Sequence, residues 1–226
     1  MLVGAGLDSF ALRRSASAHD LQIFEVDHPA TQQFKTDRLI ACEIPLPPGL
    51  HLVPTDLGKT SIDAGLAGSS FRSDQASFFS WLGVTIYLSR AANLDTLGAL
   101  AGCAQAGSEL VFGYVDQAVL DSMPHQGATG RARTAVAAAG EPWISGFDPA
   151  QLRDDLGARG WDLIANLGPE DLNARYCAGR TDGLTPSPGR IRGPRTSRFV
   201  NSIHPACTAL ATTTPGSLRL SLRFCP

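Results

Sequence analysis

The sequence predicts a doubly wound α/β fold built on a mostly parallel sheet, and three observations support this prediction. Short runs rich in β-branched and aromatic residues alternate with longer mixed segments through about residue 115. The longer segments suit helices that cross from one parallel strand to the next. A glycine-containing turn directly follows the first run, the place where open α/β sheets bind their ligands.

The strand predictions follow from length and composition. Leu2-Val3 ends a strand whose beginning is cut off at the start of the chain, so the first strand is expected to be truncated. Glu109–Val115 is the clearest run, because it is short, β-rich and preceded by Gly107. The other predicted strands are Gln22–Val26, His51–Val53, Ala76–Trp81 and Trp161–Ile164.

Helices are predicted between these strands. Pro29–Ile40 opens on proline, which suits the first helical position. Ser89–Ala104 begins with a good N-cap residue and repeats leucine at helical spacing. The other predicted helices are Asp148–Ala158, with Asp148 as its cap, and Pro169–Arg175.

Composition restricts the classes of function. Hydrophobic residues make up 43% of the chain, charged residues 18%, and the net charge is −2. This is typical of a globular protein with a small-molecule substrate, and it indicates no nucleic-acid or membrane partner. The cysteines are scattered without a CxxC pair, so we expect reduced thiols, a cytoplasmic location and no metal site. They are Cys42, Cys103, Cys177, Cys207 and Cys225.

The charge pattern divides the chain near residue 183. All 21 acidic residues lie in residues 1–182. In residues 183–226, arginine is the only residue type that is charged at pH 7, and Pro, Thr and Ser are frequent. We therefore expect one domain over 1–182 and a basic, disordered tail over 183–226.

The first chemical signal is the turn Gly4-Ala5-Gly6-Leu7-Asp8 after the strand stub. Glycines at the end of a strand allow the backbone to approach a ligand closely. A GxGxD turn is weak by itself, since an ordinary turn between a strand and a helix can look the same.

The second signal is Asp27, which ends the second predicted strand 21 residues after Gly6. A carboxylate there can accept hydrogen bonds from both hydroxyls of a ribose, although it could also cap the helix at Pro29. Nicotinamide-binding folds use the same spacing but need a third glycine, where this chain has Ser9. Asp8 would repel a pyrophosphate and tolerate a cationic ammonium or sulfonium. The pattern therefore favours S-adenosylmethionine over NAD.

Two later segments complete the pattern. Asp56-Leu57 follows the third predicted strand, where an acid can accept from an adenine amino group and the next backbone N–H can donate to a ring nitrogen. A simple turn is the alternative. The block Ser77–Leu88 then ends a strand, and its aromatic residues either line an apolar pocket or pack in the core. We assign Phe79 to the core and regard Tyr87 as more open.

Taken together and in this order, GAGLDSFALR, FEVDHPATQQFK, Asp56-Leu57 and FFSWLGVTIYLSR resemble the leucine carboxyl methyltransferase-like family. The chain is most similar to its bacterial, mycobacterial-type branch of S-adenosylmethionine-dependent methyltransferases, up to about residue 185. The resemblance implies a Rossmann-like class I methyltransferase fold. It also implies that Gly4, Gly6 and Asp8 lie near the amino-acid end of the cofactor, Asp27 at its ribose, and Asp56 with Leu57 at its adenine.

The chain departs from the family in two respects. Relatives carry a helical segment before the glycine turn that helps to cover the cofactor, so this chain is expected to be truncated at its N-terminus. Many relatives have an acid where Leu82 stands.

The expected reaction is transfer of the sulfonium methyl group to an oxygen of a carboxylate or small molecule, without a metal. An ionised carboxylate needs no base, whereas a hydroxyl acceptor does, and Tyr87 and Tyr114 are the candidates. Two alternatives stay open: an NAD-type oxidoreductase, and a non-catalytic remnant of the methyltransferase fold.

Overall fold

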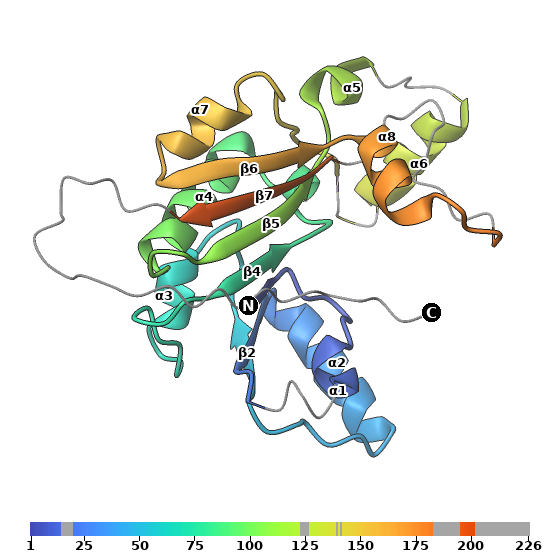
Figure 1. Ribbon diagram of the computed structural model, residues 1–226. Coiled ribbons are helices and arrows are strands. Elements are labelled where there is room, and N and C mark those ends of the chain that lie inside the picture. The colour runs from blue at the N-terminus through green and yellow to red at the C-terminus, as the bar shows by residue number, and fades with distance from the viewer. Residues whose placement is uncertain (15–19, 123–126, 139, 141, 183–194, 202–226) are drawn as a thin grey trace, which may run out of the picture.

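The computed structural model describes residues 1–14, 20–122, 127–138, 140, 142–182 and 195–201. Within them, one sheet runs in the order β3-β2-β1-β4-β5-β7-β6 (Figure 1). Its strands are β1 (Leu2–Val3), β2 (Ile23–Asp27), β3 (Leu50–Pro54), β4 (Phe78–Trp81), β5 (Glu109–Tyr114), β6 (Trp161–Leu167) and β7 (Arg195–Asn201).

The sheet is mostly parallel, as the sequence predicts. Strands β3, β2, β1, β4 and β5 are all parallel neighbours, and β7 alone runs antiparallel, between β5 and β6. The chain passes from β1 to β2 and β3 on one side, and continues with β4 and β5 on the other. The exit of β1 is therefore a topological switch point, the place where open α/β sheets bind their ligands.

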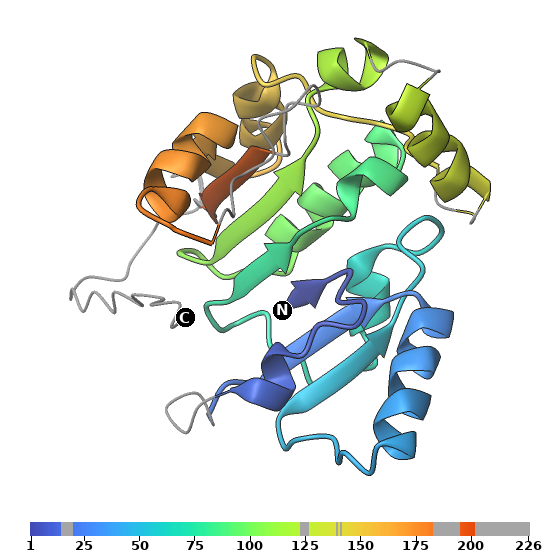
Figure 2. The same cartoon turned by 90° about the vertical axis from the view of Figure 1, so that its right-hand side faces the viewer.

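Helices cover both faces of the sheet (Figures 1 and 2). On one face lie α3, α4 and α7, and on the other lie α1, α2 and α8. Their bounds are α1 (Phe10–Arg13), α2 (Pro29–Ala41), α3 (Ile62–Leu66), α4 (Arg90–Gly102), α5 (Gln117–Ser122), α6 (Gly127–Ala138), α7 (Leu152–Gly157) and α8 (Pro169–Leu172). A 3-10 helix, η2 (Thr85–Tyr87), and a π-helix, η3 (Asn173–Cys177), complete the described elements.

The main core lies between the sheet and the face that carries α3, α4 and α7. Leu97 and Leu100 of α4 are fully buried against Leu110 and Phe112 of β5. Trp161 at the start of β6 is also buried, and its indole N–H donates to the carbonyl oxygen of Leu97 at 2.9 Å. This bond satisfies a polar atom that would otherwise be costly to bury.

Several predicted bounds need correction. The predicted helix Asp148–Ala158 begins only at Leu152, because the Asp148 side chain accepts from Ala150 N in a preceding turn. Ser89 caps α4 as expected, its hydroxyl accepting from Ala92 N at 3.1 Å. The predicted helix Pro169–Arg175 becomes α8 followed by η3.

The largest correction concerns the segment expected to be a disordered tail. Within it, Arg195–Asn201 forms β7, which is inserted between two other strands. A central strand has its backbone N–H and C=O groups hydrogen-bonded on both sides. This backbone stabilisation does not depend on the side-chain charges from which the tail was predicted. The rest of residues 183–226 lies outside the described residues.

The core assignment predicts a marked contrast between two apolar truncations. Leu100 is 0% exposed and Ile40, on α2, is 69% exposed. We expect Leu100→Ala to lower the free energy of unfolding by about 2–5 kcal/mol, because it leaves a cavity. We expect Ile40→Ala to change it by no more than about 0.5 kcal/mol. Urea unfolding followed by circular dichroism measures both, and similar losses in the two variants would contradict this core.

Candidate functional site

The glycine turn leaves β1 at the centre of the sheet and bends back over the end of β2. Gly4 and Gly6 adopt positive φ angles of 69° and 52°, which favour glycine. Gly4 N donates to Val26 O at 2.7 Å, and a Cβ at Gly4 would lie 2.1 Å from Val84 Cγ2. Gly4 is therefore required by close packing, whereas a Cβ at Gly6 would meet no atom within 4 Å. The open side of the turn is at Gly6.

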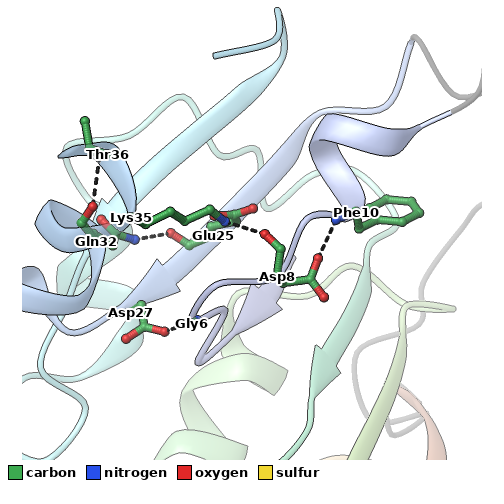
Figure 3. Close-up of polar contacts among 8 residues, drawn as sticks. All are labelled: Gly6, Asp8, Phe10, Glu25, Asp27, Gln32, Lys35 and Thr36. Atoms are coloured by element: carbon green, nitrogen blue, oxygen red, sulfur yellow. Dashed lines mark hydrogen bonds and ion pairs between the residues drawn. The ribbon is translucent and has the colours of Figure 1, made fainter. Parts of the chain in front are cut away.

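Asp27 lies directly beside this turn. One carboxylate oxygen, Oδ2, accepts from Gly6 N, and the other, Oδ1, accepts from His28 N at 2.6 Å (Figure 3). Each oxygen thus uses one acceptor position and retains another, because a carboxylate has about four in all. The half-buried Asp27 carboxylate is held firmly and can still accept a pair of hydroxyl groups.

Asp56 follows the neighbouring strand. Strands β2 and β3 pair in register through Asp27 and Pro54, and Thr55 N donates to Asp27 O at 2.7 Å. The structure thus brings Asp27 and Asp56 to the same edge of the sheet. Leu57, next in the chain, is half-buried and packs against the core.

The Asp56 carboxylate has cationic neighbours. Lys59 Nζ donates to Asp56 Oδ2 at 2.7 Å, and His28 Nε2 lies 3.7 Å from the same oxygen. The Lys59 hydrogen bond, with a further bond from Gly58 N, holds the pKa of Asp56 below its ordinary value. Asp56 therefore remains an ionised acceptor at neutral pH.

Asp8 ends the glycine turn and has a different environment. Its exposed carboxylate accepts from Phe10 N, at the first residue of the short helix α1, at 2.6 Å. Its backbone carbonyl accepts from Lys35 Nζ at 2.6 Å. The structure therefore brings Asp27 into contact with the turn that holds Gly4, Gly6 and Asp8, and places Asp56 and Leu57 just after the neighbouring strand β3.

The segment after β4 closes the opposite side of the turn through Val84. The Thr85 hydroxyl donates to Gly113 O at 2.8 Å, and Asn93 Nδ2 donates to Thr85 O at 2.8 Å. These buried bonds fix η2 to β5 and α4. Leu82, where many relatives have an acid, is 52% exposed.

The two tyrosine candidates lie in different settings. Tyr87 is half-buried in η2, at the carboxyl end of β4. Tyr114 is 1% exposed in the core, and its hydroxyl donates to Asn166 Oδ1 at 3.0 Å. The buried, bonded hydroxyl of Tyr114 does not favour a role as a base, whereas the position of Tyr87 is compatible with one.

Sequence reasoning missed three residues beside the turn: His28, Glu25 and Lys35. Glu25 is 1% exposed and Lys35 4% exposed, and they form an ion pair of 2.5 Å. The available signal was a charged residue inside an otherwise apolar strand, FEV, since a buried charge requires a partner. Nothing in the spacing identified Lys35 as that partner.

Within the described residues, no three His, Cys, Asp or Glu side chains gather in a way that could hold a metal ion. In the same residues, no helix combines the length and the apolar character needed to cross a membrane.

The fold and the residues at the carboxyl ends of β1, β2 and β3 together define a methyltransferase-like α/β domain. Comparison with known proteins agrees. The family model of leucine carboxyl methyltransferases matches residues 1–101, so this part of the chain is similar to that family. The chain is also 35% identical over 188 residues to the "Putative S-adenosyl-L-methionine-dependent methyltransferase YktD" of Bacillus subtilis (strain 168). That match covers 82% of the chain and 60% of the relative, so the chain spans less than two thirds of the relative's length. The family resemblance predicted from the sequence is confirmed.

Solved structures share the fold at low sequence identity. The mitomycin 7-O-methyltransferase MmcR matches with a TM-score of 0.53 and 11% identity, over 89% of this chain and 48% of that one. The N-methyltransferase NodS from Bradyrhizobium japonicum WM9, solved with S-adenosyl-L-homocysteine, matches with a TM-score of 0.50 and 12% identity, over 88% and 76%. The predicted Rossmann-like methyltransferase architecture is therefore confirmed.

The close packing at Gly4 can be tested by comparison with Gly107, which also has a positive φ but has no atom within 4 Å of the place of a Cβ. Gly4→Ala and Gly107→Ala both place a side chain on a left-handed backbone, which costs roughly 1–2 kcal/mol. Only Gly4→Ala also collides with Val84, and we expect a further loss of about 1–3 kcal/mol in the free energy of unfolding. Chemical denaturation measures both variants. Equal destabilisation would show that Val84 does not press on the turn.

Proposed function

We propose that this chain forms the cofactor-binding part of an S-adenosylmethionine-dependent methyltransferase that methylates an oxygen of a small-molecule or carboxylate acceptor. The observation that carries the proposal is the meeting of Gly6, Asp27 and Asp56 at the exits of three neighbouring strands. The match of residues 1–101 to the family model of leucine carboxyl methyltransferases supports it.

The residues present fit the cofactor. The free acceptor positions of Asp27 suit the two ribose hydroxyls, and the ionised Asp56 suits an adenine amino group. The backbone N–H of Leu57 would complete the adenine contacts. The turn from Gly4 to Asp8 would hold the amino-acid end, with backbone open to approach at Gly6.

Bound S-adenosylmethionine supplies an electrophilic methyl group on its sulfonium. The contribution of this chain is to orient the cofactor and to surround it with carboxylates that stabilise positive charge. An ionised carboxylate acceptor would need no base. For a hydroxyl acceptor, Tyr87 is our candidate because it lies on the segment after β4, at the same edge as the turn.

The same geometry disfavours the NAD-type alternative. Helix α1, which follows the turn, has four residues and an exposed carboxylate, Asp8, at its N-terminal end. So short a helix has little dipole, and the carboxylate repels a pyrophosphate.

The finer parts of the proposal rest on the sequence. A small-molecule acceptor follows from the absence of a basic composition, and a cytoplasmic location follows from the scattered cysteines. Whether the chain is catalytic or a remnant is decided by an assay for methyl transfer.

The proposal predicts binding of S-adenosylhomocysteine, which isothermal titration calorimetry measures directly. We expect Asp27→Ala to weaken this binding by roughly 10- to 100-fold, because hydrogen bonds to a charged group contribute about 1.5–3 kcal/mol. The matched control is Asp20→Ala, which removes an exposed carboxylate just before β2, at the opposite edge of the sheet.

Wild-type affinity in Asp20→Ala together with weak binding in Asp27→Ala would support the proposed site. Unchanged binding in Asp27→Ala, or no binding by the wild type, would refute it. Fluorescence titration with NADH provides the comparison, and saturable NADH binding without S-adenosylhomocysteine binding would favour the oxidoreductase.

A further inference from the structure

A buried ammonium group connects strand β2 to the glycine turn. Lys35 Nζ, on α2, donates to Glu25 Oε2 at 2.5 Å and to the Asp8 carbonyl oxygen at 2.6 Å (Figure 3). Its side chain is 5% exposed, and that of Glu25 is 1% exposed. A lysine this deeply buried requires acidic or carbonyl partners, and both of these partners lie beside the proposed cofactor site.

The charge of Lys35 is balanced locally. Burial raises the pKa of Glu25, the hydrogen bond and charge of Lys35 oppose that shift, and the nearby charges of Asp8 and Asp27 reinforce it. Glu25 Oε1 is buried and accepts no hydrogen bond within the described residues. Glu25 therefore depends on Lys35 for compensation, and Lys35 alone extends from this pair to the turn.

Several hydrogen bonds hold the turn along its length, among them Ala5 N to Val26 O at 3.3 Å and Asp8 N to Ala5 O at 2.8 Å. Gly4 N donates to Val26 O at the start, and Gly6 N donates to Asp27 Oδ2 in the middle. At the end, the Asp8 carbonyl is held by Lys35. The bonds of Gly4 N and Gly6 N go to residues of β2, whereas the bond to the Asp8 carbonyl comes from a side chain of α2 and can be removed by substituting Lys35.

Helix α2 has other attachments that do not involve Lys35. Gln32 Nε2 donates to Glu25 O at 2.7 Å, and His28 Nδ1 accepts from Ala30 N at 3.2 Å at the helix start. Leu39 is buried on the same helix. Removal of the Lys35 ammonium should therefore release the end of the turn without detaching α2 from the sheet.

We propose that Lys35 is a positioning residue that sets the Asp8 end of the turn for the amino-acid portion of the cofactor. This inference rests on the proposed function, because it assumes that the turn holds that portion. Asp27 and Asp56 are placed by β2 and β3 without Lys35. Lys35 thus controls affinity for ligands that carry the amino-acid tail, and leaves affinity for the nucleoside portion unchanged.

Two ligands separate these contributions: S-adenosylhomocysteine, which has the tail, and 5′-methylthioadenosine, which lacks it. Calorimetry with both is applied to the wild type, Glu25→Gln, the double variant Glu25→Gln/Lys35→Met, and Arg38→Met. The double variant avoids an unpaired buried carboxylate. Arg38 is the matched control, an exposed cation one turn further along α2.

We expect the double variant to lose at least about tenfold in affinity for S-adenosylhomocysteine, the scale of one charge-assisted hydrogen bond. Its affinity for 5′-methylthioadenosine should stay within about twofold of wild type. Glu25→Gln, which keeps Lys35 on the Asp8 carbonyl, and Arg38→Met should keep the wild-type ratio of the two affinities.

An equal loss for both ligands, or no loss for either, would overturn the role of Lys35 while leaving the proposed function intact. A wild type that binds neither ligand would overturn the proposed function and this inference together. If the double variant lacks a cooperative unfolding transition, the ratio of the affinities for the two ligands is measured on Lys35→Gln instead. The shorter side chain of that variant cannot reach both acceptors, so the same drop in ratio is expected.

Discussion

The bond between Gly6 N–H and the Asp27 carboxylate is the contact on which the rest of the site depends. It joins the exits of β1 and β2 at the switch point of the sheet. Asp27 also accepts from His28 N, so the residue that precedes α2 is bonded to the same carboxylate. One side chain thus fixes the position of the turn, and its carboxylate keeps acceptor positions that these two bonds do not use.

The electrostatics of this edge explain why it suits a cation-bearing nucleoside better than a dinucleotide. Asp8, Asp27 and Asp56 are carboxylates around one turn, and Glu25 lies buried beneath them. Two of the nearby cations are already paired, Lys35 with Glu25 and Lys59 with Asp56. An anionic pyrophosphate would face uncompensated negative charge, whereas a sulfonium and an ammonium would find acceptors.

The two halves of the sheet contribute differently. The half with β1, β2 and β3 carries the turn and its carboxylates, and it lies within the segment that the leucine carboxyl methyltransferase model matches. The half with β5, β7 and β6 supports it through η2, which Thr85 and Asn93 tie to β5 and α4. The close contact of Val84 with Gly4 transmits this support to the turn.

The sequence by itself indicated the parallel strands, the helices α2 and α4, the glycine turn, and Asp27 and Asp56 as acids at or just after the ends of two strands. These features are local, because turn residues, strand length and helical spacing depend on neighbours in the chain. The tertiary structure alone decided that β7 enters the sheet, that Tyr114 is buried, and that Lys35 reaches the Asp8 carbonyl. Each depends on partners far apart in the chain, 27 residues for Lys35 and Asp8. Backbone pairing and compensation of a buried charge become visible only when those partners are brought together.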